Sequence, residues 1–414
     1  MKTDCLVLGA GMVGISAALH LQKRGRSVVL IDRRGAAEET SFGNAGIIQR
    51  EGVVPYMFPR DPWLVAKYAF NMLPEAHYQL SSLPSIAPWL YRYWRNSTAD
   101  GEDRSARALR PLVERCIAEH EALMAVAGLS HDGLRRTGYL RVYPEAADLE
   151  AAIGVQGKIR ERYGVAFEAL DESGVKRLEP HLTGTLAGGI QMSEAVSVAD
   201  PAALGKAYAE AFVKAGGRLL TADARTLDAT TGGWRIGQVD GAIEARDVVL
   251  ALGPWSDEVF RPLGYRFPLA VKRGYHMHYQ AEGNAVLNRP VVFKVGGYAL
   301  VQTTRGIRLT TGAEFATRDA PPTPVQLEAT ERLARRRFPL GKRLDEAPWL
   351  GSRPCLPDML PVIGAAPRHK GLWLDFGHHH LGFTLGPVSG RLIAEMITGE
   401  TPVIDPAPYR ADRF

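Results

Sequence analysis

A glycine-rich segment near the N-terminus has the spacing of a phosphate-binding turn. Gly9-Ala10-Gly11-Met12-Val13-Gly14 follows one apolar run and opens another. The first glycine permits a tight turn, the second lets the backbone approach a pyrophosphate, and the third allows close helix–strand packing. Asp32 lies 18 residues after Gly14, where its carboxylate can accept hydrogen bonds from ribose hydroxyls. The segment predicts dinucleotide binding, and a tight turn without a ligand is the alternative.

This chemistry requires the turn to lie between a strand and a helix. Residues 4–8 predict a buried strand, residues 12–24 a helix, and residues 27–31 a second buried strand. Together they have the size of a βαβ unit with parallel strands. The free amides and partial positive charge at the helix start favour a phosphate. Because Arg33 follows Asp32, the motif alone leaves FAD, NAD and NADP open.

Length and composition are those of an ordinary globular protein. The chain has 414 residues, which suggests two or three domains, and its three cysteines are too few and too far apart for a disulfide framework or a thiolate metal site. This cysteine usage favours a reducing compartment. The net charge of +5 is a mild excess. We interpret its basic residues as solvated faces, with nucleic-acid or anionic-membrane contact as the alternative. The sequence contains no run of eighteen apolar residues, so no membrane-spanning helix is predicted.

Two kinds of sheet are predicted further along the chain. Polar alternation favours an antiparallel sheet with strands at residues 138–143, 187–192, 268–279, 290–302 and 306–312. Further strands and helices that fit the parallel sheet are predicted at residues 200–221, 246–253, 372–376 and 385–398. One domain is therefore expected to be discontinuous, with the other inserted into it.

Four ordered motifs resemble the D-amino-acid oxidase superfamily, and more closely its bacterial D-amino-acid dehydrogenase branch. Residues 40–46 (Thr-Ser-Phe-Gly-Asn-Ala-Gly) resemble the family's Ser-x-x-Asn-Ala-Gly turn. Residues 249–256 resemble its strand-Gly-x-Trp element, residues 351–364 its Arg-Pro…Pro-Asp-Gly-x-Pro…Gly motif, and residues 377–384 its Gly-His-Gly-x-x-Gly-x-Thr turn. With the glycine turn, the resemblance covers nearly the whole chain.

The resemblance implies an α/β fold with a GR-type Rossmann FAD-binding domain and an inserted antiparallel-sheet substrate domain. We expect the FAD domain to comprise residues 1–47, 195–258 and 348–414, and the substrate domain to comprise residues 48–194 and 259–347. Some relatives attach the flavin through a histidine after the Ser turn, but Phe42 and Gly43 stand there, so non-covalent FAD is expected. The implied FAD contacts are Gly9, Gly11, Met12, Val13, Gly14, Asp32, Arg33, Ser41, Asn44, Ala45, Gly46, Arg225, Gly253, Trp255, His378, His379, Leu381, Gly382 and Thr384.

An amine-oxidising flavoenzyme needs a group that holds the substrate carboxylate. Arg353 occupies the family's substrate-arginine motif, and a guanidinium can bind a carboxylate through two hydrogen bonds. The alternative is a structural ion pair with Asp358. Arg273 and Tyr275 share one face of a predicted strand. Both are further candidates, with Tyr275 favoured as a substrate contact and an ordinary packed tyrosine as its alternative.

The triplet His378-His379-His380 invites a metal-site interpretation, which we reject. Adjacent residues in a turn point in different directions, and no carboxylate or cysteine is spaced to complete a site. We expect no metal, and assign His380 to substrate or flavin contact. Met359, His379 and His380 depart from the family's usual residues and leave the substrate open.

Residues 55–95 contain ten of the chain's 34 aromatic residues and six prolines. A lid over the pocket, a membrane- or quinone-contacting patch and a buried packing layer are the three interpretations. The expected location is cytoplasmic, with peripheral contact to the inner membrane as the alternative.

The motifs together predict FAD-dependent oxidation of a D-amino acid or a cyclic D-imino acid, with D-proline and hydroxy-D-proline as candidates. The imine product hydrolyses to a keto acid or cyclises. Alternatives are a glycine- or sarcosine-type amine oxidase, the flavin domain of an RNA-modifying protein, and a non-catalytic flavin-binding module. The electron acceptor stays open between a quinone, an electron carrier and oxygen, and no nucleic-acid partner is expected.

Overall fold

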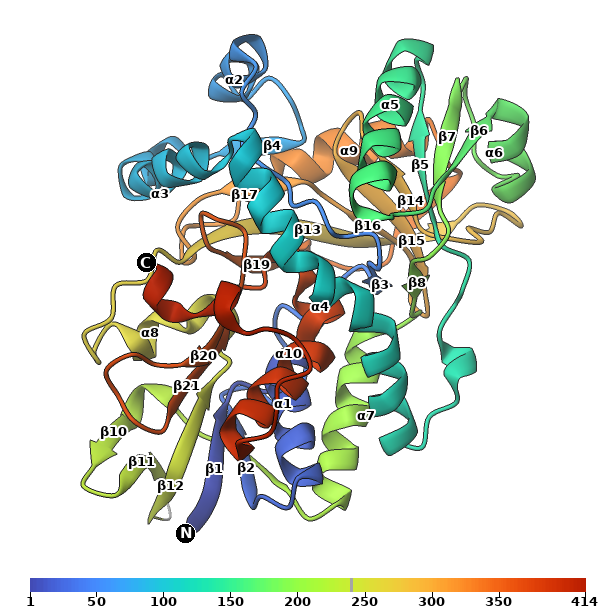
Figure 1. Ribbon diagram of the computed structural model, residues 1–414. Coiled ribbons are helices and arrows are strands. Elements are labelled where there is room, and N and C mark those ends of the chain that lie inside the picture. The colour runs from blue at the N-terminus through green and yellow to red at the C-terminus, as the bar shows by residue number, and fades with distance from the viewer. Residues whose placement is uncertain (239–240) are drawn as a thin grey trace.

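Two large sheets form the framework of the molecule. The computed structural model describes residues 1–238 and 241–414. Figure 1 shows the first sheet with its helices in the lower half of the view and the second sheet in the upper half. A separate two-stranded ribbon pairs β3 (Ile47–Ile48) with β8 (Val196–Ser197). The observed arrangement confirms the expected combination of a parallel nucleotide-binding sheet and a mainly antiparallel sheet.

The first sheet is parallel at its centre, in the order β21-β12-β1-β2-β9. Antiparallel β11 and β10 extend one end of β12, and β20 pairs antiparallel with β21. Its strands are β1 (Lys2–Leu8), β2 (Val28–Asp32), β9 (Arg218–Thr221), β10 (Leu227–Thr230), β11 (Gly233–Gln238), β12 (Gly241–Leu250), β20 (Val362–Ala365) and β21 (Leu372–Phe376). The βαβ unit predicted from the first 31 residues is therefore present.

The helices, with the exception of short 3-10 turns, number ten in the described residues. They are α1 (Met12–Lys23), α2 (Pro62–Ala69), α3 (Leu83–Asn96), α4 (Ala99–Val126), α5 (Ala146–Tyr163), α6 (Glu172–Leu178), α7 (Pro201–Lys214), α8 (Asp257–Phe260), α9 (Val325–Arg335) and α10 (Gly382–Thr398). No helix in residues 1–238 and 241–414 has both the length and the apolar character that crossing a bilayer requires.

Helix α10 packs tightly on α1, although 370 residues separate their starts. Two glycines of α10 make this approach feasible. A Cβ on Gly390 would lie 2.5 Å from the backbone nitrogen of Ala17, and one on Gly386 would lie 2.8 Å from Cγ of Met12. The C-terminal helix thus completes the layer that holds the start of α1 in place.

The second sheet is built around β13, which pairs antiparallel with β16, β17, β18 and β19. Its strands are β4 (Ala76–Tyr78), β5 (Tyr139–Tyr143), β6 (Glu168–Asp171), β7 (Gly188–Met192), β13 (Ala270–Ala281), β14 (Val291–Phe293), β15 (Tyr298–Thr303), β16 (Gly306–Thr310), β17 (Ala313–Phe315), β18 (Leu340–Arg343) and β19 (Trp349–Cys355). Two of its pairings, β14 with β5 and β17 with β4, are parallel. The strand predicted over 290–302 is two strands, because a turn containing Gly296 and Gly297, both at positive φ, interrupts it.

The predicted domain boundary at residue 348 falls just before a strand of the second sheet. Strand β19 begins at Trp349 and pairs with β13 along seven residues, whereas residues 348–414 were assigned to the FAD domain. This pairing joins segments about eighty residues apart, for which the sequence carries no local signal. The domain boundaries stay predictions.

Candidate active site

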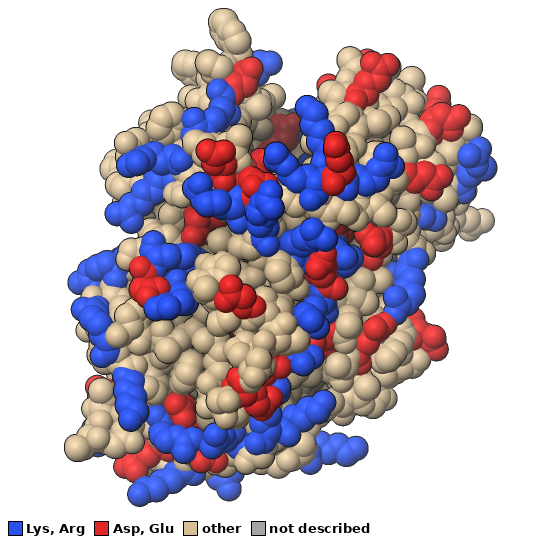
Figure 2. Space-filling model, viewed as in Figure 1, with Lys and Arg blue, Asp and Glu red and all other residues tan. Residues whose placement is uncertain are grey.

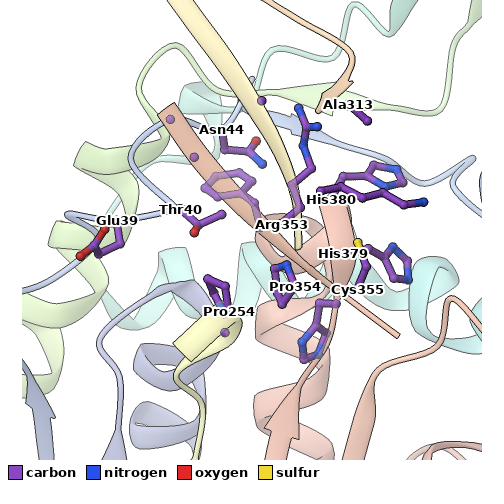
Figure 3. Close-up of a pocket in the computed structure, with 18 of the residues that line it drawn as sticks. Glu39, Thr40, Asn44, Pro254, Ala313, Arg353, Pro354, Cys355, His379 and His380 are labelled. Atoms are coloured by element: carbon purple, nitrogen blue, oxygen red, sulfur yellow. The ribbon is translucent and has the colours of Figure 1, made fainter. Parts of the chain in front are cut away.

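A cavity of about 1250 Å³ runs between the two sheets. Its lining extends from Gly9 and Asp32 on the first sheet to Tyr275 and Arg353 on the second. Figure 3 shows Glu39 and Thr40 on one side of this cavity and Cys355, His379 and His380 on the other, with Arg353 between them. Because pockets for one small ligand usually measure about 300–1,000 Å³, the cavity has room for a large cofactor and a substrate.

The glycine turn has the geometry that the sequence predicted. Gly9 has φ +102°, and a Cβ there would lie 2.5 Å from the carbonyl oxygen of Ala251. A Cβ on Gly14 would lie 1.9 Å from the carbonyl oxygen of Gly9. Helix α1 starts immediately after Gly11 with no acidic residue in its first turn. The turn therefore presents free amides and a positive helix end to the cavity, as a bound pyrophosphate requires.

Asp32 has backbone partners that the sequence did not reveal. Its Oδ2 accepts a hydrogen bond from the amide of Ala10 at 2.8 Å, and its Oδ1 accepts from the amides of Arg34 and Gly35. The carboxylate lines the cavity while it fixes the turn. Its contact with a ribose stays a prediction.

The expected nucleotide end of the cavity is lined by charged and aromatic side chains. The guanidinium of Arg33 lies 4.3 Å from the centre of the Trp255 ring. Arg225 also lines the cavity and forms an ion pair with Asp223 at 2.7 Å. A slot between β2, β9 and Trp255 is therefore available for an adenosine moiety.

The Ser41–Gly46 turn is held from both sheets. The hydroxyl of Ser41 accepts a hydrogen bond from the amide of Met12 at 3.0 Å, and Asn44 Oδ1 accepts from the amide of Gly46. Arg308 on β16, which the sequence analysis missed, donates from Nη1 to the carbonyl of Asn44 and, at 3.4 Å, to that of Phe42. Gly43 leaves room for the ring of Trp349, because a Cβ there would lie 2.0 Å from it.

Arg308 is itself fixed by a buried chain of polar groups. Its Nε donates to His278 Nε2 at 3.0 Å, and His278 Nδ1 donates to Asp345 at 2.7 Å. Burial and the Arg308 charge lower the pKa of His278, which keeps its Nε2 free to accept. This chain anchors the predicted flavin turn to the second sheet.

Most of the predicted FAD contacts lie around one cavity. Four of them do not line it: Gly14, Gly46, Leu381 and Thr384. Gly14 and Gly46 shape the two turns, since a Cβ on Gly46 would lie 2.4 Å from the carbonyl oxygen of Val198. Thr384 donates to the carbonyl of Ile47 and accepts from the amide of Gln49. The glycine cradle, the free start of α1 and the cavity volume fit FAD, and the individual contacts stay predictions.

Arg353 is a partly buried cation in the part of the cavity wall that the second sheet provides. Its Nη1 donates to the carbonyl of Gly312 at 3.0 Å, and its Nη2 lies 3.4 Å from that of Thr311. Asp358, the alternative partner, forms its ion pair with Arg413 instead. The guanidinium therefore faces the cavity without a carboxylate among the described residues, and it is available to an anionic ligand.

Arg273 and Tyr275 have different positions. Arg273 is fully buried, does not line the cavity, and forms an ion pair with Glu314 at 2.7 Å. It also donates to the carbonyl of Pro321, so its role is to hold the segment after β17. We therefore remove Arg273 from the candidate site. Tyr275 does line the cavity, but its hydroxyl already donates to Glu314 and accepts from the amide of Thr323.

Two lysines that the sequence analysis missed also line the cavity. Lys272 on β13 has its ammonium 3.9 Å from the centre of the Tyr93 ring, and Lys294 has its ammonium 4.9 Å from the centre of the Tyr56 ring. Burial lowers the pKa of Lys272 to about 8. No motif marks either lysine, because their positions depend on strand pairing and on the turn after β14.

The three histidines at the start of α10 point to different partners. His378 Nε2 lies 3.4 Å from Asp375 Oδ1, His379 contacts the carbonyl of Met359, and the ring of His380 lies 5.1 Å from that of Tyr56. Burial lowers the pKa of His380 well below its usual value and raises that of Asp375. Because the three imidazoles have separate partners, they do not converge on one point. In residues 1–238 and 241–414, no three His, Cys, Asp or Glu side chains are grouped to hold a metal ion.

Five buried histidines predict loss of stability in acid. Burial lowers the pKa to about 3 for His20, His276, His378 and His379 and to about 4 for His120. An unfolded histidine titrates near 6.5, so their contribution is complete above that pH and is lost as the pH falls below it. Each should lower the free energy of unfolding by about 1.4 kcal/mol per pH unit well below 6.5.

Thermal melts of the holoprotein between pH 7.5 and 5 measure this effect. The melting temperature should fall steeply below pH 6.5. His20 lies on α1 and away from the cavity. The variant His20→Gln should reduce the slope of the unfolding free energy against pH by the contribution of about one proton. An unchanged melting temperature across this range would contradict the assignment of neutral buried histidines.

Comparison with known proteins gives a consistent result. The model of the family described as DAO, FAD dependent oxidoreductase, matches residues 4–396. A D-amino acid dehydrogenase of Paramagnetospirillum magneticum is 32% identical, and the match covers 99% of this chain and 98% of the relative. A D-amino-acid oxidase of Bradyrhizobium diazoefficiens is 29% identical with the same coverage. Among solved structures, glycine oxidase from Geobacillus kaustophilus superposes with a TM-score of 0.75 at 21% identity, over 100% of this chain and 99% of that one.

Proposed function

Because the chain belongs to the DAO family of FAD-dependent oxidoreductases, we propose that it oxidises the Cα–N bond of a D-amino acid or a cyclic D-imino acid. The D configuration is inferred from the two relatives of about 30% identity, which are named as a D-amino acid dehydrogenase and a D-amino-acid oxidase. D-proline and hydroxy-D-proline are the cyclic candidates. A glycine- or sarcosine-type amine oxidase is the nearest alternative.

The observation that carries the proposal is Arg353. Its partly buried guanidinium lines the cavity with only backbone carbonyls as partners. A planar guanidinium holds a carboxylate through two parallel hydrogen bonds, which fixes the orientation of the attached carbon. In this proposal Arg353 binds the α-carboxylate and so determines which substituent of Cα faces the cofactor.

FAD, when bound, supplies the acceptor for the hydride that leaves Cα. The protein then has three tasks: it positions Cα, excludes water, and keeps the amine neutral. Burial lowers the pKa of His380 well below its usual value, so its imidazole can accept a hydrogen bond from the substrate amine without adding positive charge. The aromatic walls of Tyr56, Phe58 and Tyr93 limit access of water. Hydrolysis of the imine product gives a keto acid, and a product with a suitable side chain cyclises.

The direct test is anaerobic loss of the visible flavin absorbance of purified protein. It uses D- and L-alanine, D- and L-proline, the hydroxyprolines, D- and L-glutamate, glycine and sarcosine. Rapid bleaching by D-isomers and not by their L-partners is expected. Faster bleaching by glycine or sarcosine would favour the alternative, and a yellow protein that no amine bleaches would refute the proposal. Admitting air afterwards separates an oxidase from a dehydrogenase.

We further propose that electrons leave to an acceptor at an anionic membrane surface. Helices α2 and α3 project from one end of the molecule (Figure 1), and α2 has no buried residue. Trp63 is 80% exposed and Phe70 is 77% exposed. Other large apolar side chains exposed in this segment are Met72, Leu80, Tyr91 and Trp94. The exposed basic residues of the same segment are Arg60, Lys67, Arg92 and Arg95, and Figure 2 shows basic side chains at this end of the molecule. An apolar surface bordered by basic residues is typical of contact with anionic lipid.

Vesicle flotation measures this contact. The protein should float with vesicles that contain anionic lipid, and Trp63→Ser with Phe70→Ser should reduce the bound fraction about tenfold or more because two large apolar anchors are lost. Val155→Ser with Val213→Ser, at exposed positions on α5 and α7, is the matched control. Equal flotation of both double variants would remove this part of the proposal.

A further inference from the structure

Three cations converge on the substrate end of the cavity. Lys272, Lys294 and Arg353 all line it, and no carboxylate oxygen of the described residues lies within 4.0 Å of their charged nitrogens. A single α-carboxylate needs only one of them. The surplus positive charge therefore requires an explanation beyond the binding of the α-carboxylate that we propose for Arg353.

Lys272 and Arg353 stand directly opposite each other on neighbouring strands. The register of β13 and β19 pairs Lys272 with Arg353, so both side chains leave the same face of the sheet. Like charges in this arrangement destabilise a sheet, and burial increases the cost of an unpaired charge. This unfavourable arrangement lies at the wall of the cavity between the two sheets, which favours a role in binding an anion.

The two side chains then diverge. Arg353 lies over Gly274, where a Cβ would come within 2.5 Å of its Nη2. Lys272 turns instead toward Met359, whose sulfur is 3.8 Å from Nζ, and toward the ring of Tyr93. Each cation thus has its own surroundings, and the pair presents two separate binding points.

The ammonium of Lys272 lacks a strong hydrogen-bond acceptor. The residue is 8% exposed, and its only hydrogen-bond partner among the described residues is the weakly accepting sulfur of Met359. Aromatic faces stabilise a cation but do not accept its N–H groups as an oxygen does. A buried ammonium with unused donors at a cavity wall matches a carboxylate of the ligand.

Acidic residues near this end do not neutralise the cations. Glu75 lines the cavity, but its Oε1 accepts from the amide of Gly296. Asp375 also lines the cavity, and burial raises its pKa well above the usual value, which disfavours its charged form. None of the three cations has a carboxylate partner within 4.0 Å among the described residues, so their donors are available to a ligand.

We propose that the substrate is a dicarboxylic amino acid of the D-glutamate or D-aspartate class. Arg353 binds the α-carboxylate, Lys272 binds the side-chain carboxylate, and Lys294, over the Tyr56 ring that packs against His380, adds to the positive field. This inference rests on the proposed function, because it assigns the substrate of the same site.

The test compares isosteric pairs that differ only in the charge of the side chain. For the wild-type holoenzyme, kcat/KM for D-glutamate should exceed that for D-glutamine by about 10- to 100-fold, the usual value of a hydrogen bond to a charged group. D-aspartate should exceed D-asparagine in the same way. A ratio near one, or D-proline as the preferred substrate, would overturn the inference.

Variants assign the second carboxylate to a residue. Lys272→Met keeps the length of the side chain and should reduce the D-glutamate/D-glutamine ratio toward one. Lys294→Met should reduce it by a smaller factor, and Lys214→Met, exposed at the end of α7, is the charge-matched control. If Lys294→Met brought the D-glutamate/D-glutamine ratio close to one and Lys272→Met did not, the assignment to Lys272 would be overturned.

Binding without turnover separates this inference from the proposed function. Glutarate, a dicarboxylate without an amine, should perturb the visible flavin spectrum of the holoenzyme at a concentration about 10-fold or more below that of butyrate. Lys272→Met should remove this difference. If glutarate binds tightly while no amine bleaches the flavin, the dicarboxylate site stands and the oxidation proposal fails. If D-amino acids bleach the flavin but glutarate and butyrate bind equally, the oxidation proposal stands and this inference fails.

Discussion

Replacing Arg353 by methionine is expected to lower kcat/KM for every amino-acid substrate by about 100-fold or more, mainly through a higher KM. The variant removes two charge-assisted hydrogen bonds to the α-carboxylate, each worth about 1.5–3 kcal/mol. The substrate that still binds is also held with Cα less well oriented toward the cofactor. Steady-state kinetics over a wide substrate range measures the split between KM and kcat.

Controls for this variant separate substrate binding from packing. Arg353 also donates to the carbonyls of Thr311 and Gly312, so its loss affects the local structure. Arg353→Lys retains the charge but not the planar pair of donors, and should recover part of the lost affinity. Arg343→Met removes an ion pair on the edge strand β18 and should leave kinetics unchanged. Wild-type kinetics in Arg353→Met with normal FAD content would exclude Arg353 from the site.

Adding one methyl group at Gly14 is expected to abolish FAD binding or folding. A Cβ there would lie 1.9 Å from the carbonyl oxygen of Gly9, which is backbone and cannot yield without opening the turn. Since the same turn presents its amides to the cavity, Gly14→Ala should purify without flavin absorbance or fail to fold.

Another glycine of the chain provides a matched control. Gly154 also lies inside a helix, α5, but a Cβ there would meet nothing within 4 Å. Gly154→Ala should keep full FAD content and gain about 0.5–1 kcal/mol of stability, because alanine favours a helix over glycine. Flavin absorbance per protein and thermal melts compare the two variants. Full FAD content in Gly14→Ala would contradict the packing described for the turn.

Local patterns in the sequence predicted the cofactor half of the site. The glycine spacing, the apolar strands around it and Asp32 all act over about thirty residues, and β1, α1 and β2 are found where expected. Helix α7, within the predicted segment 200–221, begins after Asp200, whose side chain accepts a hydrogen bond from the amide of Ala203.

The substrate half depends on distant pairings that the sequence does not encode locally. Strand alternation grouped Arg273 with Tyr275, yet it could not reveal that Glu314 lies opposite Arg273 and removes it from the cavity. Lys272 looked like an ordinary polar residue of a strand, because its importance arises only when β19 places Arg353 beside it. The role of Arg308 likewise depends on a distant contact, because its guanidinium donates to the carbonyl of Asn44 in the Ser41–Gly46 turn.

The packing of α10 on α1 has a consequence for biosynthesis. The phosphate-binding turn is translated long before α10 (Gly382–Thr398), which completes the layer behind it, and before β21 (Leu372–Phe376), which must insert beside β12. Until α10 has been synthesised, one apolar face of α1 therefore lacks its cover. Exposed apolar surface of this kind favours chaperone binding, and stable flavin uptake is expected only after α10 has packed on α1.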